Sequence, residues 1–161
     1  MVYQELKIFY QSLAWMINLA IVEDDSLNRI YQYLVDVDED FTPPLSERVE
    51  IKRYAEKLSS NAINVFVSIN TQDIAHAAFY ANDMSQSRAF LTSISVKSAA
   101  RGRGVSDALM KDILLRSMKA GMTEIFLEVD ATNTGAIRFY RKVGFEFSKG
   151  SDSTMFLTLK Q

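Results

Sequence analysis

The sequence has 161 residues, the size of one ordinary domain, and its 48% hydrophobic and 24% charged residues are typical of a folded globular chain. A formal net charge of −2 and a pI near 5.4 provide no overall attraction for nucleic acid, so we expect no nucleic-acid partner. The sequence contains no cysteine and one histidine, which excludes disulfides, a cysteine nucleophile and a zinc site made of thiolates or several histidines.

The N-terminal region has the least clear pattern. Apolar positions from residue 3 to residue 22 recur at roughly helical spacing, although Leu19, Ile21 and Val22 could equally form a strand. The run from Ile8 to Val22 has no formal charge over fifteen residues, but a spanning helix needs roughly 20 residues. We therefore expect a packed helix or strand, with membrane association as the less favoured alternative. A chain without cysteine is compatible with the reducing cytosol, and we expect a cytoplasmic protein.

Two helices are expected next. Ser26 can cap a helix from Leu27 to about Val37, and Ser46 can cap a second from Glu47 to about Leu58. Between them lies an acidic run that contains Asp36, Asp38, Glu39 and Asp40. Carboxylates at a helix C-terminus oppose the helix dipole, so helix stability does not explain this run. A solvated loop is its simplest interpretation.

The middle of the chain predicts an antiparallel meander of three strands, Ile63–Ile69, Ile74–Ala81 and Ala89–Lys97. A helix from Val105 to Ala120 follows and ends at Gly121, with Val105, Ala108, Leu109, Leu115 and Met118 as its inward candidates. A strand from Glu124 to Val129 comes after this crossover, and we expect it to be parallel to the strand before the helix.

The last elements complete one domain over residues 1–161. They are a helix from Thr134 to Val143, which ends at Gly144, and a hairpin of Phe145–Phe147 with Thr154–Lys160. The fold class is therefore α/β (α+β), with a mixed, mostly antiparallel sheet of six or seven strands flanked by about four helices. The exposed edge of the closing hairpin could pair with a second subunit, so a homodimer is open.

A glycine loop joins the third meander strand to the long helix, in the run Ala100-Arg101-Gly102-Arg103-Gly104-Val105-Ser106. Such a loop directs several backbone N–H groups to one point, where the helix dipole adds positive potential. It predicts an anion site, for a phosphate. A Walker loop does not occur, and a dinucleotide fingerprint would need glycine where Asp107 stands, so a nucleotide-binding domain is disfavoured.

Two strings of residues resemble signatures of the GNAT acetyltransferases. Arg101 to Ser106 is similar to the R/Q-x-x-G-x-G/A signature, with serine at the last position where the family has glycine or alanine. Asn133 to Phe145 looks like the family segment N-x-x-A-x-x-F-Y-x-x-x-G-F. The two motifs stand in the expected order, and the resemblance covers about residues 61–159. It implies the GNAT fold and an acetyl-CoA-dependent N-acetyltransferase that needs no metal.

The resemblance also implies a place for acetyl-CoA. Pyrophosphate would be held by the N–H groups and charges of Arg101, Gly102, Arg103, Gly104, Val105 and Ser106. In GNAT structures the end of the fourth strand, here Ile94, Ser95 and Val96, pairs with the pantetheine arm and polarises the thioester carbonyl. Asn133 resembles a cofactor-contacting asparagine of the family, although an asparagine before a helix is also an ordinary cap.

Tyr140 stands where the family often has the general acid for the coenzyme A thiolate. A phenol stays protonated at neutral pH and can donate a proton, but this tyrosine could instead be a core aromatic residue. The base that deprotonates the amine is left open between a water chain and several side chains: Asp36, Asp38, Asp40, His76, Tyr80, Glu128 and Asp130. In the GNAT fold the acidic run would border the acceptor site, where it would suit a cationic amine.

Because the sequence has no cysteine, an acyl-cysteine intermediate is impossible, and we expect direct transfer. The expected acceptor is a primary amine of a small molecule or an amino sugar, with a protein amine as a further option. The missing base and Ser106 keep a non-catalytic acyl-CoA-binding module as the alternative.

Overall fold

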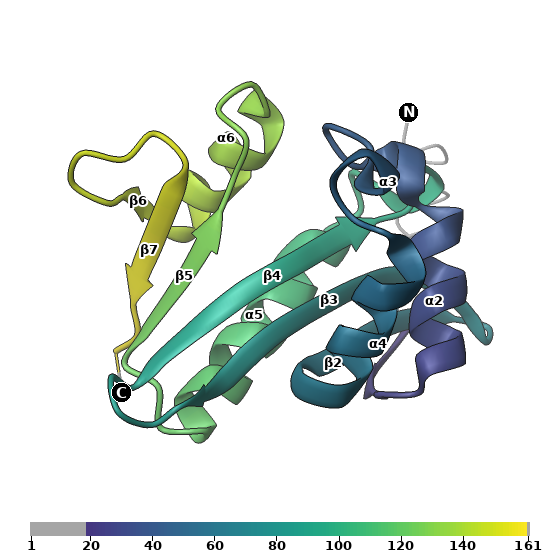
Figure 1. Cartoon of the computed structure of the whole chain (residues 1–161), viewed down its shortest axis with the longest axis horizontal. Coiled ribbons are helices and arrows are strands. Elements are labelled where there is room, and N and C mark those ends of the chain that lie inside the picture. The colour runs from purple at the N-terminus through teal and green to yellow at the C-terminus, as the bar shows by residue number, and fades with distance from the viewer. Residues whose placement is uncertain (1–18, 161) are drawn as a thin grey trace, which may run out of the picture.

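The computed structural model describes residues 19–160, which form a seven-stranded sheet with helices on both faces (Figure 1). The strand order is β1-β2-β3-β4-β5-β7-β6. The strands are β1 (Leu19–Glu23), β2 (Ile63–Ile69), β3 (Gln72–Asp83), β4 (Arg88–Val96), β5 (Glu124–Glu128), β6 (Glu146–Phe147) and β7 (Thr154–Thr158). Every neighbouring pair is antiparallel except β4 with β5, which confirms the mixed, mostly antiparallel α/β sheet.

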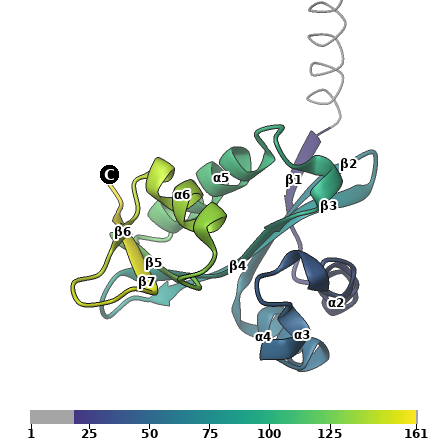
Figure 2. The same ribbon diagram turned by 90° about the horizontal axis from the view of Figure 1, so that it is seen from above.

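The helices of the described part are α2 (Leu27–Asp36), α3 (Leu45–Arg48), α4 (Ile51–Asn61), α5 (Val105–Lys119) and α6 (Thr134–Val143). The first three cover one face of the sheet, and α5 and α6 cover the other (Figure 2). Alternation along β3 explains the two layers, because Ala77 and Phe79 pack into the α5 core while Ala78 packs into the α2–α4 core.

The first strand settles one open alternative. Leu19–Glu23 is a strand paired with β2, and the helical prediction for residues 3–18 lies outside the described residues. Within residues 19–160, no helix is long and apolar enough to cross a membrane.

The prediction of one helix from Glu47 to about Leu58 is wrong about where the helix begins. The chain forms the short helix α3, becomes extended at Val49 (φ −144°, ψ 155°), and begins α4 at Ile51. Ser46 lies inside α3, whereas the carboxylate of Glu50 accepts hydrogen bonds from the N–H groups of Lys52 and Arg53. Glu50 is therefore the cap, although serine is the commoner residue there.

Replacing Glu50 by alanine should destabilise the protein by about 1 kcal/mol, because two N–H groups at the start of α4 lose their acceptor. Urea unfolding would measure the change, and Ser46→Ala is the comparison, with a smaller expected loss because the Ser46 hydroxyl interacts with Asp38 but caps no helix. A larger loss from Ser46→Ala than from Glu50→Ala would contradict this assignment of the cap.

The inward face of α5 also differs in one position from the prediction. Leu115 is 45% exposed, while Leu109, Ile113 and Ser117 are fully buried. These three residues are four apart and form one stripe on the helix, which leaves Leu115 on the solvent side.

Candidate active site

A cleft of about 450 Å³ opens where β4 and β5 separate. The parallel pairing of the two strands ends at Leu91 with Leu127. On the other side of β4, Ala78 pairs with Ser93 and Phe79 with Leu91, so Thr92 is an extra residue, a β-bulge. Beyond the bulge, β4 no longer pairs with β5, and the edge of β4 that faced β5 borders the cleft.

Two backbone N–H groups of β4 point toward this cleft. The N–H of Lys97, just after β4, donates to the carbonyl of Ile74 in β3. Alternation along a strand then turns the N–H groups of Val96 and Ile94 to the opposite edge. The carbonyl of Val96 supports this direction, because it accepts a hydrogen bond of 3.1 Å from Nε of Arg101 on the cleft side.

The glycine loop gives α5 an open N-terminus beside the cleft. Gly102 and Gly104 have φ angles of 74° and 77°, a left-handed conformation that glycine adopts without strain. Gly104 is the N-cap of α5 and carries no side chain that could cover the first N–H groups of the helix. The positive end of the helix dipole therefore faces solvent here.

Arg101 holds the loop in place and brings charge to the cleft. Besides its bond to Val96, its guanidinium forms an ion pair of 3.2 Å with Asp40 of the acidic run. The side chain is 52% exposed, so it can still contact an anion. This pair links the loop before α3 to the loop before α5, segments far apart in the sequence.

Tyr140 lies in the wall of the cleft that α6 provides. It is 8% exposed, and its ring packs against Phe139 and edge-on against Phe145, with ring centroids 5.6 and 5.7 Å apart. Burial raises the pKa of Tyr140 to about 12. The phenol is therefore both part of the core and a protonated group at a cleft.

The structure brings seven of the predicted site residues into this cleft, namely Ile94, Ser95, Val96, Arg101, Ser106, Asn133 and Tyr140. Gly102, Arg103, Gly104 and Val105 are not among the lining residues, and they form the turn that positions the helix N-terminus. Asn133 acts as a cap, because its side-chain oxygen accepts a hydrogen bond from the N–H of Ala136. The cleft also contains residues that the sequence did not indicate, among them Phe41, Arg48, Thr92 and Ser93.

Of the seven candidates for the general base, four lie outside the cleft lining, namely Asp36, Asp38, His76 and Tyr80, and three belong to it, namely Asp40, Glu128 and Asp130. Asp36 pairs with Lys97, and Asp38 accepts from the N–H of Ser46. Asp130 lines the cleft, but hydrogen bonds from Thr132 lower its pKa. Glu128 also lines the cleft, at the end of β5.

His76 is a core residue and lies outside the cleft lining. It is fully buried, and its Nε2 lies 3.1 Å from the side-chain oxygen of Asn64. The amide nitrogen of Asn64 donates to the carbonyls of Leu58 and Ala62, so Nε2 of His76 carries the proton. Burial lowers the pKa of His76 to about 3, which keeps it neutral.

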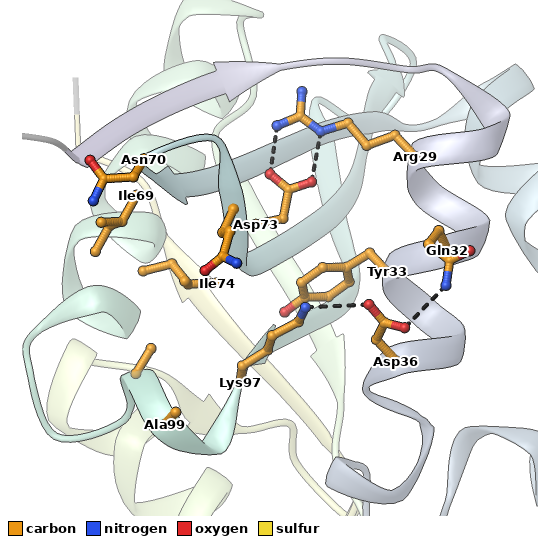
Figure 3. Close-up of a pocket in the computed structure, with 12 residues that line it drawn as sticks. Arg29, Gln32, Tyr33, Asp36, Ile69, Asn70, Asp73, Ile74, Lys97 and Ala99 are labelled. Atoms are coloured by element: carbon orange, nitrogen blue, oxygen red, sulfur yellow. Dashed lines mark hydrogen bonds and ion pairs between the residues drawn. The ribbon is translucent and has the colours of Figure 1, made fainter.

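A second pocket of about 650 Å³ lies between α2, the β2–β3 turn and the end of β4 (Figure 3). Its charged side chains are paired with one another, Arg29 with Asp73 and Lys97 with Asp36. Tyr33 connects it to β4, because the phenol donates a 3.2 Å hydrogen bond to the carbonyl of Ser95. A side chain of this pocket therefore helps to hold β4, the strand that borders the cleft, in position.

A family model described as the acetyltransferase (GNAT) family matches residues 27–145, and no curated protein matches the sequence. The fold is similar to that of ribosomal-protein-S18-alanine N-acetyltransferase from Escherichia coli, with a TM-score of 0.71 and 20% identity over 89% of this chain and 95% of that chain.

Two further similar structures contain a coenzyme. The protein yncA from Salmonella typhimurium, solved with its cofactor acetyl-CoA, has a TM-score of 0.69 and 14% identity over 89% of this chain and 95% of that chain. The paia N-acetyltransferase from Thermoplasma acidophilum, solved with coenzyme A, has a TM-score of 0.67 and 16% identity over 87% and 98%. At these identities the structural comparisons show a shared fold.

Proposed function

The chain belongs to the GNAT acetyltransferase family, and from this premise we propose that it transfers an acetyl group from acetyl-CoA directly to a primary amine of a small molecule or an amino sugar. One observation carries the proposal. A single cleft is bordered by two outward N–H groups of β4, the open N-terminus of α5 with Arg101, and the phenol of Tyr140.

The residues present fit acetyl-CoA. The first N–H groups of α5 and the guanidinium of Arg101 would hold the diphosphate, and the N–H groups of Val96 and Ile94 would bind the pantetheine arm. Space is free around the loop, since a side-chain carbon added at Gly102 or Gly104 would meet nothing within 4 Å. The similar structures solved with acetyl-CoA and coenzyme A support this ligand.

The chemistry then depends on two groups of this chain. Backbone N–H groups that point at a developing oxyanion stabilise it, and their loss costs orders of magnitude in rate. Tyr140 would give its proton to the sulfur as the carbon–sulfur bond breaks. The amine loses a proton to water, and Tyr140 regains one from water, so no proton is gained or lost over the whole reaction.

Release of free thiol from acetyl-CoA tests the proposal, with a panel of glucosamine, ethanolamine and a peptide that begins with alanine. The peptide belongs in the panel because the similar Escherichia coli enzyme is named for an alanine of a ribosomal protein. Calorimetric binding of coenzyme A without transfer to any amine would favour the alternative, a non-catalytic acyl-CoA-binding module.

Replacing Gly104 by alanine should lower the affinity for coenzyme A about tenfold, because a left-handed conformation costs a non-glycine residue roughly 1–2 kcal/mol and the loop would move. Gly121, at the other end of α5, has φ 83° and equally free space, so Gly121→Ala is the matched control. Calorimetry should show a loss of affinity for Gly104→Ala alone. Equal losses in both variants would contradict a role of the loop in binding.

A further inference from the structure

Three aromatic side chains lie side by side on neighbouring strands of the sheet. Phe90 of β4 pairs with Phe126 of β5, and Phe126 pairs with Phe156 of β7. Residues paired across strands share a face of the sheet, so the three rings form one row, which we call the phenylalanine row. The ring centroids of Phe126 and Phe156 are 5.8 Å apart, with 25° between the ring planes.

The phenylalanine row points away from α5 and α6. Leu91, Leu127 and Met155 are next to the three rings along their strands and belong to the core that α5 covers, so alternation turns the rings to the opposite face. Helices α2, α3 and α4 lie on that face, but they gather at the end of the sheet that β1, β2 and β3 form (Figures 1 and 2). Among residues 19–160, no helix covers this face of β5 and β7.

The row is therefore an apolar surface without a covering element. Phe90 is 37% exposed, Phe126 and Phe156 are partly exposed, and neither core of the described residues includes the three rings. Contiguous exposed apolar side chains mark binding sites, because covering them removes apolar surface from water. A phenyl ring has no hydrogen-bonding group, so the row suits an alkyl or aromatic group better than the hydroxyl-rich ring of an amino sugar.

The row continues into the cleft along β5. Glu128 lines the cleft and is exposed, and it stands two residues after Phe126, so both side chains lie on the same face. Two residues of a strand span roughly 7 Å. A short carbon arm between a nitrogen and an aromatic ring bridges such a span. An ammonium group beside Glu128 therefore leaves the apolar part of the same molecule over Phe126.

Charges at the two ends of the row set the direction in which an amine lies on it. Arg88 is two residues before Phe90, at the end of β4 away from the cleft. Its guanidinium lies 5.1 Å from the ring centroid of Phe126 and pairs with Glu124 at 3.0 Å. A cation at this end disfavours an ammonium group, whereas the carboxylate of Glu128 at the cleft end attracts one.

A second copy of the chain suits the row less well than a small amine. A standard protein interface buries about 800 Å² on each partner, and one aromatic side chain contributes at most about 250 Å². Three rings that are already partly buried, with charged residues at both ends of the row, provide much less than that area.

We propose that the phenylalanine row is the apolar part of the acceptor site, so that the acceptor is a primary amine with an aromatic or alkyl group; this rests on the function proposed above. The ammonium group lies beside Glu128 and releases a proton to water. The nitrogen then bonds to the acetyl carbon as the carbon–sulfur bond breaks, and it loses a second proton to water. The sulfur takes the proton of Tyr140, which Tyr140 regains from water.

The test adds 2-phenylethylamine to the panel and compares its kcat/KM with that of ethanolamine, because both have a two-carbon arm and differ in the ring or hydroxyl at its end. In the unchanged protein we expect a ratio of at least about ten in favour of the aromatic amine. Replacing Phe126 by alanine should lower this ratio about tenfold, because the ring of the amine loses its contact. The ratio does not depend on the folded fraction, so a loss of stability cannot imitate the effect.

Two further variants control for the size and place of the change. Phe126→Leu keeps an apolar side chain and should retain most of the ratio, which also guards against a misfolded alanine variant. Tyr31→Ala removes an aromatic ring of similar exposure, 39%, from α2, and it should leave the ratio unchanged.

An equal ratio in the unchanged protein and in Phe126→Ala would overturn the inference. A preference for ethanolamine or glucosamine over 2-phenylethylamine would also overturn it, while the proposed function would stand. Light scattering that shows a dimer for the unchanged protein and a monomer for Phe126→Ala would instead make the row a contact between two copies. If no amine is acetylated, the proposed function fails, and the inference fails with it.

Discussion

Replacing Tyr140 by phenylalanine should lower turnover at least about a hundredfold while the affinity for coenzyme A stays the same. General acid catalysis typically contributes 10²–10⁴-fold, and phenylalanine removes only the hydroxyl. The ring would keep its contacts with Phe139 and Phe145, so the midpoint of thermal unfolding should change little. Steady-state thiol release and calorimetric titration with coenzyme A measure the two quantities.

Tyr31→Phe is a suitable control for this variant, because Tyr31 lies on α2 and its side chain is 39% exposed. Full turnover in Tyr140→Phe would make Tyr140 a core aromatic residue only. A parallel loss of turnover and coenzyme A affinity would make it a binding residue. The pKa of about 12 adds a further expectation, since no fall in turnover from ionisation of this phenol should occur near neutral pH.

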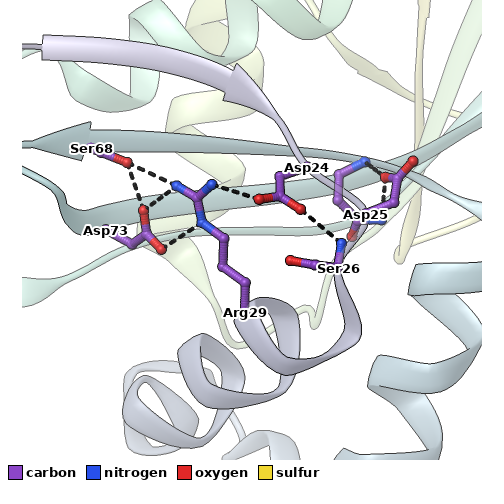
Figure 4. A network of polar contacts seen from close by, with 7 residues as sticks. Asp24, Asp25, Ser26, Arg29, Ser68 and Asp73 are labelled. Carbon is purple, nitrogen blue, oxygen red and sulfur yellow. Dashed lines mark hydrogen bonds and ion pairs between the residues drawn. The ribbon is translucent and has the colours of Figure 1, made fainter.

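Replacing Arg29 by methionine should destabilise the protein by about 2–3 kcal/mol, between the values for an exposed and a fully buried ion pair. Its guanidinium donates to both carboxylate oxygens of Asp73, to Asp24 and to Ser68 Oγ (Figure 4). It also lies 4.3 Å from the ring centroid of Phe66. The variant would leave Asp73, which is 19% exposed, without its cation. Urea unfolding at neutral pH measures the loss.

Arg53→Ala is the matched control, because Arg53 and Glu50 are 3.9 Å apart and largely exposed, and that pair should contribute less than about 0.5 kcal/mol. Arg29→Lys keeps the charge but not the two parallel hydrogen bonds, so an intermediate loss is expected. A loss in Arg29→Met no larger than that in Arg53→Ala would show that the network does not stabilise the fold.

The same network predicts how the stability of the folded protein depends on pH. Hydrogen bonds from Ser26 and Arg29 lower the pKa of Asp24 to about 2, and for Asp73 the bonds from Arg29 and Ser68 outweigh burial and lower its pKa as well. Lowered carboxyl pKa values give stability that is complete above the unfolded value near 3.9 and is lost as pH falls through the folded values. The stability difference between the unchanged protein and Arg29→Met should therefore shrink between about pH 5 and pH 2.

Local patterns predicted most of the elements. The strand expected over Ile63–Ile69 has those bounds in the structure, and the helices expected at Val105 and Thr134 begin at those residues. The two helices end next to Gly121 and Gly144, as predicted, and both glycines have positive φ. These features follow from side-chain periodicity and from the φ range of glycine, which act over a few residues.

Other features depend on contacts between segments far apart. The break between α3 and α4 separates two stretches with good helical composition, and no local stop signal marks it. The extra residue Thr92 is visible only in the pairing of β4 with β3, because a bulge leaves no mark in the residue types. The ion pair of Arg101 with Asp40 joins two loops about sixty residues apart, and no local pattern pairs these two side chains.

By itself, the sequence determined the order and type of most elements, the glycine loop before α5 and the family motifs, because each of these depends on residues that are close together in the chain. Only the tertiary structure decided which side chains meet at the cleft. Sheet register and a one-residue bulge place Ser93 on one face and Tyr140 on the other, and shifting a strand by one residue would exchange the faces.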